Sequence, residues 1–159
     1  MRPTRVRTLI VLAAVVGVLA WLFLHVVDNR GSTLPSLTWT APAGVLALAL
    51  VVGVSWVAVR RRRDPAQIRL RPIDPLGMAR MAVLGKAAAH VGAALLGFYL
   101  GWVVLLLPDL GIDARRERAL IAAVAAVGAV LLAVAGLLLE RACRVSDDDE
   151  GPTPAPSGP

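Results

Sequence analysis

One stretch of 27 residues, 81–107, constrains the fold of this chain more than any other. It reads MAVLGKAAAHVGAALLGFYLGWVVLLL, and as an α-helix it is long enough to cross a lipid bilayer. Two strongly polar side chains, Lys86 and His90, lie well inside it. Small residues recur along it at every fourth position, namely at Gly85, Ala89, Ala93, Gly97 and Gly101. This pattern is typical of a helix that packs closely against other helices in lipid.

The composition of the chain indicates a membrane protein. Its 159 residues are expected to form one domain, and 57% of them are hydrophobic, which is too apolar for a soluble domain of this size. The formal net charge of +6 would suggest nucleic-acid binding in a soluble protein. Here the arginines lie beside apolar segments, where they act as topology signals and contact anionic lipid. We therefore expect the lipid bilayer as a partner and no nucleic acid.

Four apolar segments are predicted to be transmembrane helices, at residues 8–27, 42–59, 81–107 and 119–139. The first follows three arginines, as a signal peptide would, but its length and the three later segments favour an uncleaved helix. Pro75 is a suitable first residue for the third helix, and Pro108 ends that helix. The predicted fold is an all-α bundle of four transmembrane helices within residues 1–145.

The distribution of basic residues predicts the orientation in the membrane. If the N-terminus, the loop after the second segment and the C-terminus lie inside, 12 of the 17 Lys and Arg residues are inside and four are outside. The positive-inside rule therefore places both termini in the cytoplasm and the protein in the cell membrane as a multi-pass protein. Residues 146–159, SDDDEGPTPAPSGP, are predicted to be a disordered acidic and proline-rich cytoplasmic tail, because they cannot bury a core.

Lys86 and His90 are the candidate functional residues within a span. They are four residues apart and so share a helix face. Ionisable groups inside a membrane are costly and often mark an ion path, a proton relay or a substrate anchor. The favoured interpretation is structural: a lysine that extends its ammonium back to the interface, and a histidine hydrogen-bonded to a neighbouring helix. No carboxylate lies in the middle of a span, which argues against a proton-coupled carrier.

Glu140 is the carboxylate at the depth that matches Lys86, at the inner end of the fourth segment. We therefore predict a contact between Lys86 and Glu140, either direct or bridged by water. The basic run Arg60, Arg61, Arg62 and Arg63 is a candidate contact for anionic lipid, with a protein docking site as the alternative.

The sequence predicts no cofactor and no metal site. Its single cysteine, Cys143, excludes an intrachain disulfide and a cysteine-based zinc cluster. An enzyme has the least support, because the chain contains no catalytic constellation and no glycine-rich phosphate loop.

Several motifs resemble a known family. They are MRPTR at residues 1–5, RPIDPL at 71–76, LGKA at 84–87 and LERACRV at 139–145. The chain is similar in these segments to the "domain of unknown function 3180" family of small actinobacterial membrane proteins. The resemblance implies a four-helix integral membrane protein of unassigned activity, and it transfers no catalytic residue. Sixteen arginines against one lysine fit a GC-rich bacterial genome.

Two classes of function follow from these observations. The first is a structural or accessory membrane protein that interacts with another membrane protein or with anionic lipid. The second is a small carrier or channel, built as a homo-oligomer, with Lys86 and His90 in its pathway. The first class predicts a stable partner and tolerance of His90→Ala, whereas the second predicts loss of function in that variant.

Overall fold

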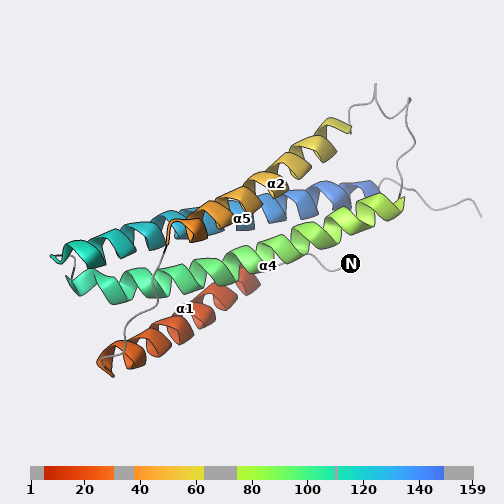
Figure 1. The fold of residues 1–159 in the computed structure, drawn as a ribbon. Helices are drawn as coiled ribbons and strands as arrows, with labels where there is room; N and C mark the ends of the chain where they lie inside the picture. The colour runs from red at the N-terminus through yellow and green to blue at the C-terminus, as the bar shows by residue number, and fades with distance from the viewer. Residues whose placement is uncertain (1–5, 31–37, 63–74, 110, 149–159) are drawn as a thin grey trace, which may run out of the picture.

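The computed structural model describes residues 6–30, 38–62, 75–109 and 111–148, and these are almost entirely helical (Figure 1). The elements in order are α1 (Val6–Asn29), α2 (Thr40–Arg62), α4 (Pro75–Leu106), a 3-10 turn η1 (Leu107–Asp109) and α5 (Asp113–Asp148). The all-α prediction is therefore confirmed. Helix α5 continues to Asp148, three residues into the predicted tail. Residues 149–159 lie outside the described part of the chain.

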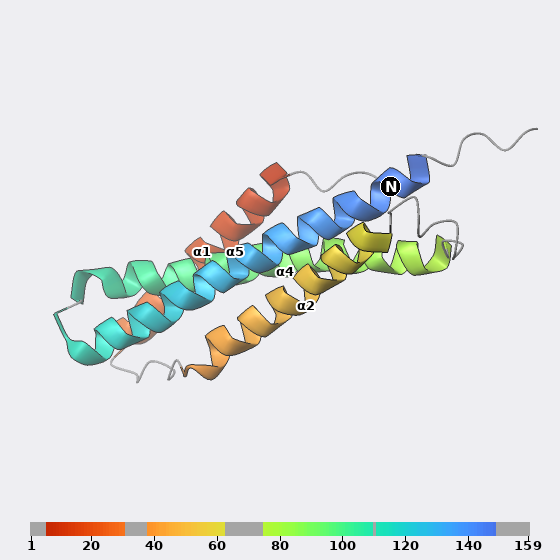
Figure 2. The same ribbon diagram turned by 90° about the horizontal axis from the view of Figure 1, so that it is seen from above.

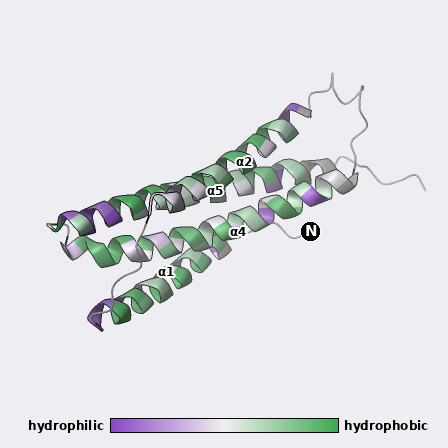
Figure 3. Cartoon of the chain, in the orientation of Figure 1, coloured by the Kyte–Doolittle hydropathy of each residue, from purple (hydrophilic) through white to green (hydrophobic). Residues whose placement is uncertain are grey.

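Four of the described helices are long and apolar enough to cross a membrane, as the sequence predicts. Their apolar segments are Val6–Asn29, Thr40–Arg61, Ala79–Leu106 and Asp113–Cys143. Each extends beyond the bilayer core that a span of about 20 residues covers. Polar residues gather toward the helix ends and apolar residues fill the middle (Figure 3). This distribution is that of a multi-pass membrane protein.

The helix boundaries follow from local chemistry. Pro75 begins α4, as predicted, because its fixed φ suits the first turn and its missing N–H has no partner to lose there. Pro108 lies in η1, where α4 has just ended. Helix α5 begins at Asp113, and the carbonyl of Ile112 accepts hydrogen bonds of 2.9 Å from the backbone N–H of Arg115 and of Arg116. The short connection through η1 makes α4 and α5 antiparallel neighbours.

The helices lie in the order α1–α4–α5–α2 (Figures 1 and 2). The largest interface joins α4 to α5, while α1 packs on α4 and α2 packs on α5. Helices α1 and α2, which are consecutive in the sequence, therefore lie on opposite flanks of the α4–α5 pair. We call the end where α1 and α4 begin the Arg7 end, and the end where α5 begins the Arg115 end.

Glycine brings the backbones of α4 and α5 into direct contact. A Cβ atom added to Gly92 would lie 2.6 Å from the backbone nitrogen of Ala133, and one added to Gly136 would lie 2.5 Å from that of Ala89. At Gly85 the nearest atom would be the backbone nitrogen of Glu140, at 2.8 Å. No real side chain tolerates such separations, so any larger residue would push the two helices apart.

The small residues at every fourth position of α4, from Gly85 to Gly101, form a stripe that contacts two different helices. Gly85 faces α5, whereas a Cβ atom added to Gly101 would lie 2.9 Å from the backbone oxygen of Gly17 on α1. One at Gly97 would overlap the carbonyl oxygen of Ala13, also on α1. Four residues turn an α-helix by about 400°, so each step of the stripe moves about 40° around the axis. Over the 16 residues from Gly85 to Gly101 the stripe turns by about 160°, which takes it from one neighbour to the other.

Large side chains of α4 pack on the alanine face of α5 toward the Arg115 end. Trp102 is 1% exposed and Leu106 is fully buried. They form one cluster with fully buried alanines of α5, Ala122, Ala125 and Ala129. Because alanine leaves room for an indole ring and leucine does not, large and small residues complement each other across this interface.

Replacing Gly136 with leucine is expected to destabilise the α4–α5 pair. The side chain would enter a contact with no free space, and overpacking of this kind costs about 1–3 kcal/mol or more. The matched control is Gly53→Leu on α2, where a Cβ atom meets nothing within 4 Å. Thermal unfolding in mild detergent should show a lower Tm for Gly136→Leu and no loss for Gly53→Leu. Equal Tm values for the two variants would contradict the described interface.

Candidate functional site

His90 is hydrogen-bonded within its own helix. Its Nδ1 atom lies 2.8 Å from the carbonyl oxygen of Lys86, one turn earlier, so an N–H at this position donates to that oxygen. The ring is half-buried. The expected partner on a neighbouring helix is replaced by this local acceptor, because the imidazole of a residue four positions later can reach the carbonyl directly. One ring nitrogen of His90 is thus hydrogen-bonded without a contact to a second helix.

Lys86 and Glu140 lie at similar depth but point differently. The backbone of Gly85, the residue before Lys86, touches that of Glu140. The Lys86 side chain is exposed, whereas Glu140 is 6% exposed. Lys86 lies about 100° around α4 from Gly85, the residue that faces α5, and so projects away from that helix.

The contact predicted between Lys86 and Glu140, either direct or bridged by water, stays a prediction. Among the side chains that the structure describes, the ion pair shown joins Arg115 to Asp28 at 3.6 Å.

The basic run after α2 is only partly described. The guanidinium carbon of Arg60 lies 5.5 Å from the centre of the Trp56 ring, a cation–π contact in the last turns of α2. Arg61 is exposed. The side chain of Arg62 and the whole of Arg63 lie outside the described residues. Their contact with anionic lipid stays a prediction.

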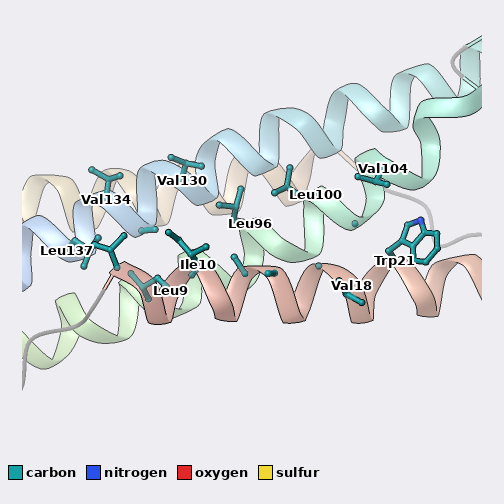
Figure 4. A pocket seen from close by; sticks show the side chains of 17 residues that line it. Leu9, Ile10, Val18, Trp21, Leu96, Leu100, Val104, Val130, Val134 and Leu137 are labelled. Atoms are coloured by element: carbon teal, nitrogen blue, oxygen red, sulfur yellow. The ribbon is translucent and has the colours of Figure 1, made fainter.

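An apolar groove of about 670 Å³ runs along the helices between α1 and α5, with α4 as its floor (Figure 4). We call it the α1–α5 groove. Figure 4 shows Leu9 and Leu137 toward one end and Trp21 and Val104 toward the other. Its lining is formed by Val6, Leu9, Ile10, Ala13, Ala14, Gly17, Val18 and Trp21 of α1, Ala93, Leu96, Leu100, Gly101 and Val104 of α4, and Val130, Ala133, Val134 and Leu137 of α5.

The groove exists because α1 and α5 share α4 as a neighbour. Glycine contacts hold α1 against α4 at Gly97 and Gly101, while α5 packs on a different face of α4. At the Arg115 end the pair between Asp28 and Arg115 connects α1 to α5. One turn before Asp28, His25 stacks on Trp21 with ring centres 5.2 Å apart.

The α1–α5 groove cannot be predicted from the sequence, because hydrophobic periodicity shows which residues share a helix face and not which helices are neighbours.

The described residues contain no group of three or more His, Cys, Asp or Glu side chains that could hold a metal ion. Cys143 is buried. The described polar residues of the spans therefore do not form a ligand site together, whereas the α1–α5 groove is a space that a ligand could occupy.

Comparison with known proteins places the chain in a family. A family model described as "protein of unknown function (DUF3180)" matches residues 9–147, which include nearly all of the described helices. The chain belongs to the DUF3180 family. The resemblance carried by the sequence motifs is thus confirmed. The chain matches no curated protein and no solved structure. Because the DUF3180 description assigns no activity, the function has to be argued from the groove and the helix surfaces.

Replacing His90 with alanine is expected to leave the fold stable, because its hydrogen bond is local and contributes only about 1 kcal/mol. Trp102→Ala is the contrasting variant. Its ring is 1% exposed, and removing a buried aromatic side chain costs about 3–5 kcal/mol. Unfolding in detergent should give nearly unchanged Tm for His90→Ala and a strongly lowered Tm for Trp102→Ala. A His90→Ala variant as unstable as Trp102→Ala would show that the histidine holds helices together.

Proposed function

We propose that this DUF3180 protein is a non-enzymatic accessory protein of the bacterial cell membrane that works by holding another membrane protein. This proposal rests on the difference in buried fraction among the four helices. In the most apolar window of each span, 50% of residues are buried in α4 and in α5, against 28% in α2 and 11% in α1. The central pair forms the scaffold, and the two flanks present apolar surface to the membrane plane. Small residues and exposed side chains on such flanks suit lateral contact with a second helical protein.

The alternative of a carrier built around Lys86 and His90 has less support. A transport path needs polar groups that converge on a cavity. The α1–α5 groove is lined by apolar side chains and glycine, and the α4–α5 contact is closed by glycine. The Nδ1 atom of His90 is already hydrogen-bonded to the carbonyl oxygen of Lys86 on the same helix. A carrier would therefore require an assembly of several copies.

The Arg7 end is proposed to face the cytoplasm. The sequence assigns 12 of its 17 basic residues to this end and four to the other, and positively charged loops remain inside. The Arg60–Trp56 pair at the end of α2 would then lie at the anionic headgroups of the inner leaflet. An actinobacterial host fits the arginine-rich composition.

A photo-crosslinking amino acid on each flank tests the accessory function. Phe23 of α1 is 66% exposed and Leu50 of α2 is 69% exposed, so replacement at either position leaves the core intact. In native membranes, one of the flanks is expected to crosslink to a single second membrane protein in stoichiometric yield, and His90→Ala should not change that yield.

The test needs a control for background crosslinking. The same chain without the crosslinking residue gives the background. Products that contain only lipid or further copies of this chain, together with solute flux in proteoliposomes that His90→Ala abolishes, would overturn the accessory function in favour of the carrier.

A further inference from the structure

We propose that the α1–α5 groove binds one acyl chain of an anionic membrane phospholipid, whose headgroup is held at the Arg7 end by Arg7, Lys86 and Arg141. This inference goes beyond the accessory function. It rests on the placement of the four helices in a bilayer and not on the existence of a protein partner.

The dimensions of the groove fit a lipid chain and not a helix. Its lining on α1 runs from Val6 to Trp21, which is about 22 Å at 1.5 Å per residue. A helix of that length and about 10 Å in diameter fills about 1,700 Å³, whereas the groove holds about 670 Å³. One leaflet of the hydrocarbon core is about 15 Å thick. An acyl chain that enters from the Arg7 end and spans one leaflet can therefore run along about two thirds of the apolar lining.

Lys86 lies on the face of α4 that forms the floor of the groove, but beyond the lining residues toward the Arg7 end. It precedes Ala93 by seven residues and Val104 by 18, which are about two and five helical turns. Both of these residues line the groove, so the three share one face of α4. The Lys86 side chain is exposed. Its ammonium can therefore extend along this face to the mouth of the groove.

Arg141 and Arg7 lie on the two walls. Arg141 follows Leu137 by four residues, about one turn, and Leu137 lines the groove from α5. Arg7 precedes Ala14 by seven residues, about two turns, and Ala14 lines the groove from α1. Both arginine side chains are exposed. The three cations thus come from three different helices and border one opening.

Packing contacts set the relative depth of these cations. Gly85 lies against Gly136 and Glu140, which puts Lys86 within about a turn of Arg141 along the axis. Leu9 packs with Ala89 and Ala93, which puts Arg7 within about a turn of Lys86. Long Arg and Lys side chains span such separations easily.

The exposed charged side chains that the structure describes near the mouth of the groove are positive. Among the acidic residues whose side chains are described, Glu140 is the one at the Arg7 end, and it is buried rather than at the mouth. Arginine and lysine bind phosphate oxygens through charge-assisted hydrogen bonds. A phospholipid with a net negative headgroup complements both the apolar groove and the three cations. A zwitterionic phospholipid would add its own positive charge beside these cations.

Native mass spectrometry of the purified protein with defined lipids tests the charge requirement. The probe is an equimolar mixture of phosphatidylglycerol and phosphatidylcholine. The unaltered chain is expected to retain one phosphatidylglycerol with a preference of about tenfold or more. In the variant R7Q/K86Q/R141Q this preference should fall to near parity.

The matched control is R30Q/R116Q/R118Q. It removes the same number of positive charges from α5 and from the residue that follows α1, but at the Arg115 end, away from the proposed headgroup, so it should keep the preference. Equal loss in both triple variants, or none in R7Q/K86Q/R141Q, would overturn the proposal.

A second pair of variants tests the groove itself. Ala14→Phe places a ring in the groove, whereas Ala47→Phe places one on an exposed position of α2 outside it. Bound phosphatidylglycerol should be lost from Ala14→Phe and kept by Ala47→Phe. Equal retention by both would overturn the proposal. Because the protein is purified without a partner, failure to find a protein partner would not change these results, and loss of lipid binding would not decide the accessory function.

Discussion

The close approach of α4 and α5 is the contact on which the rest of the structure depends. In a bilayer there is no water to drive helices together, so association relies on van der Waals contact between surfaces that fit closely. Gly85, Gly92 and Gly136 allow the two backbones to touch, and the alanines of α5 accept the large side chains of α4. Once this pair is formed, each of its members offers an outer face, and α1 and α2 attach to those faces separately.

The separate attachment of α1 and α2 explains where a ligand could bind. If α1 packed equally against α4 and α5, no space would remain between them. Its small residues instead direct it to α4, at Gly97 and Gly101. The resulting groove is apolar along its length, and the proposed lipid headgroup would lie at its Arg7 end. The same arrangement leaves most of α1 uncovered by the rest of the chain, which connects the proposed lipid site to the proposed partner surface.

Much of the fold can be predicted from sequence, because hydrophobic length and proline position act locally. The four spans, the start of α4 at Pro75 and the small-residue face of α5 are examples. Which helices pack against each other is harder to predict from the sequence. The stripe from Gly85 to Gly101 suggests one interface, but its drift around the helix divides it between two. For the same reason Lys86 and Glu140 match in depth and differ in direction. The side-chain partner of His90 depends on a rotamer, which periodicity does not specify.

The helix order α1–α4–α5–α2 is the central claim, since the groove and the open flanks both follow from it. Disulfide crosslinking of paired cysteines in membranes, with Cys143 replaced by alanine, tests it most directly. The Leu9→Cys/Ala93→Cys pair joins α1 to α4, where both residues are buried in one cluster and no glycine contact is disturbed. This pair is predicted to crosslink, and the Ala20→Cys/Ala43→Cys pair between α1 and α2 is predicted not to. Efficient crosslinking of the second pair and none of the first would contradict the order.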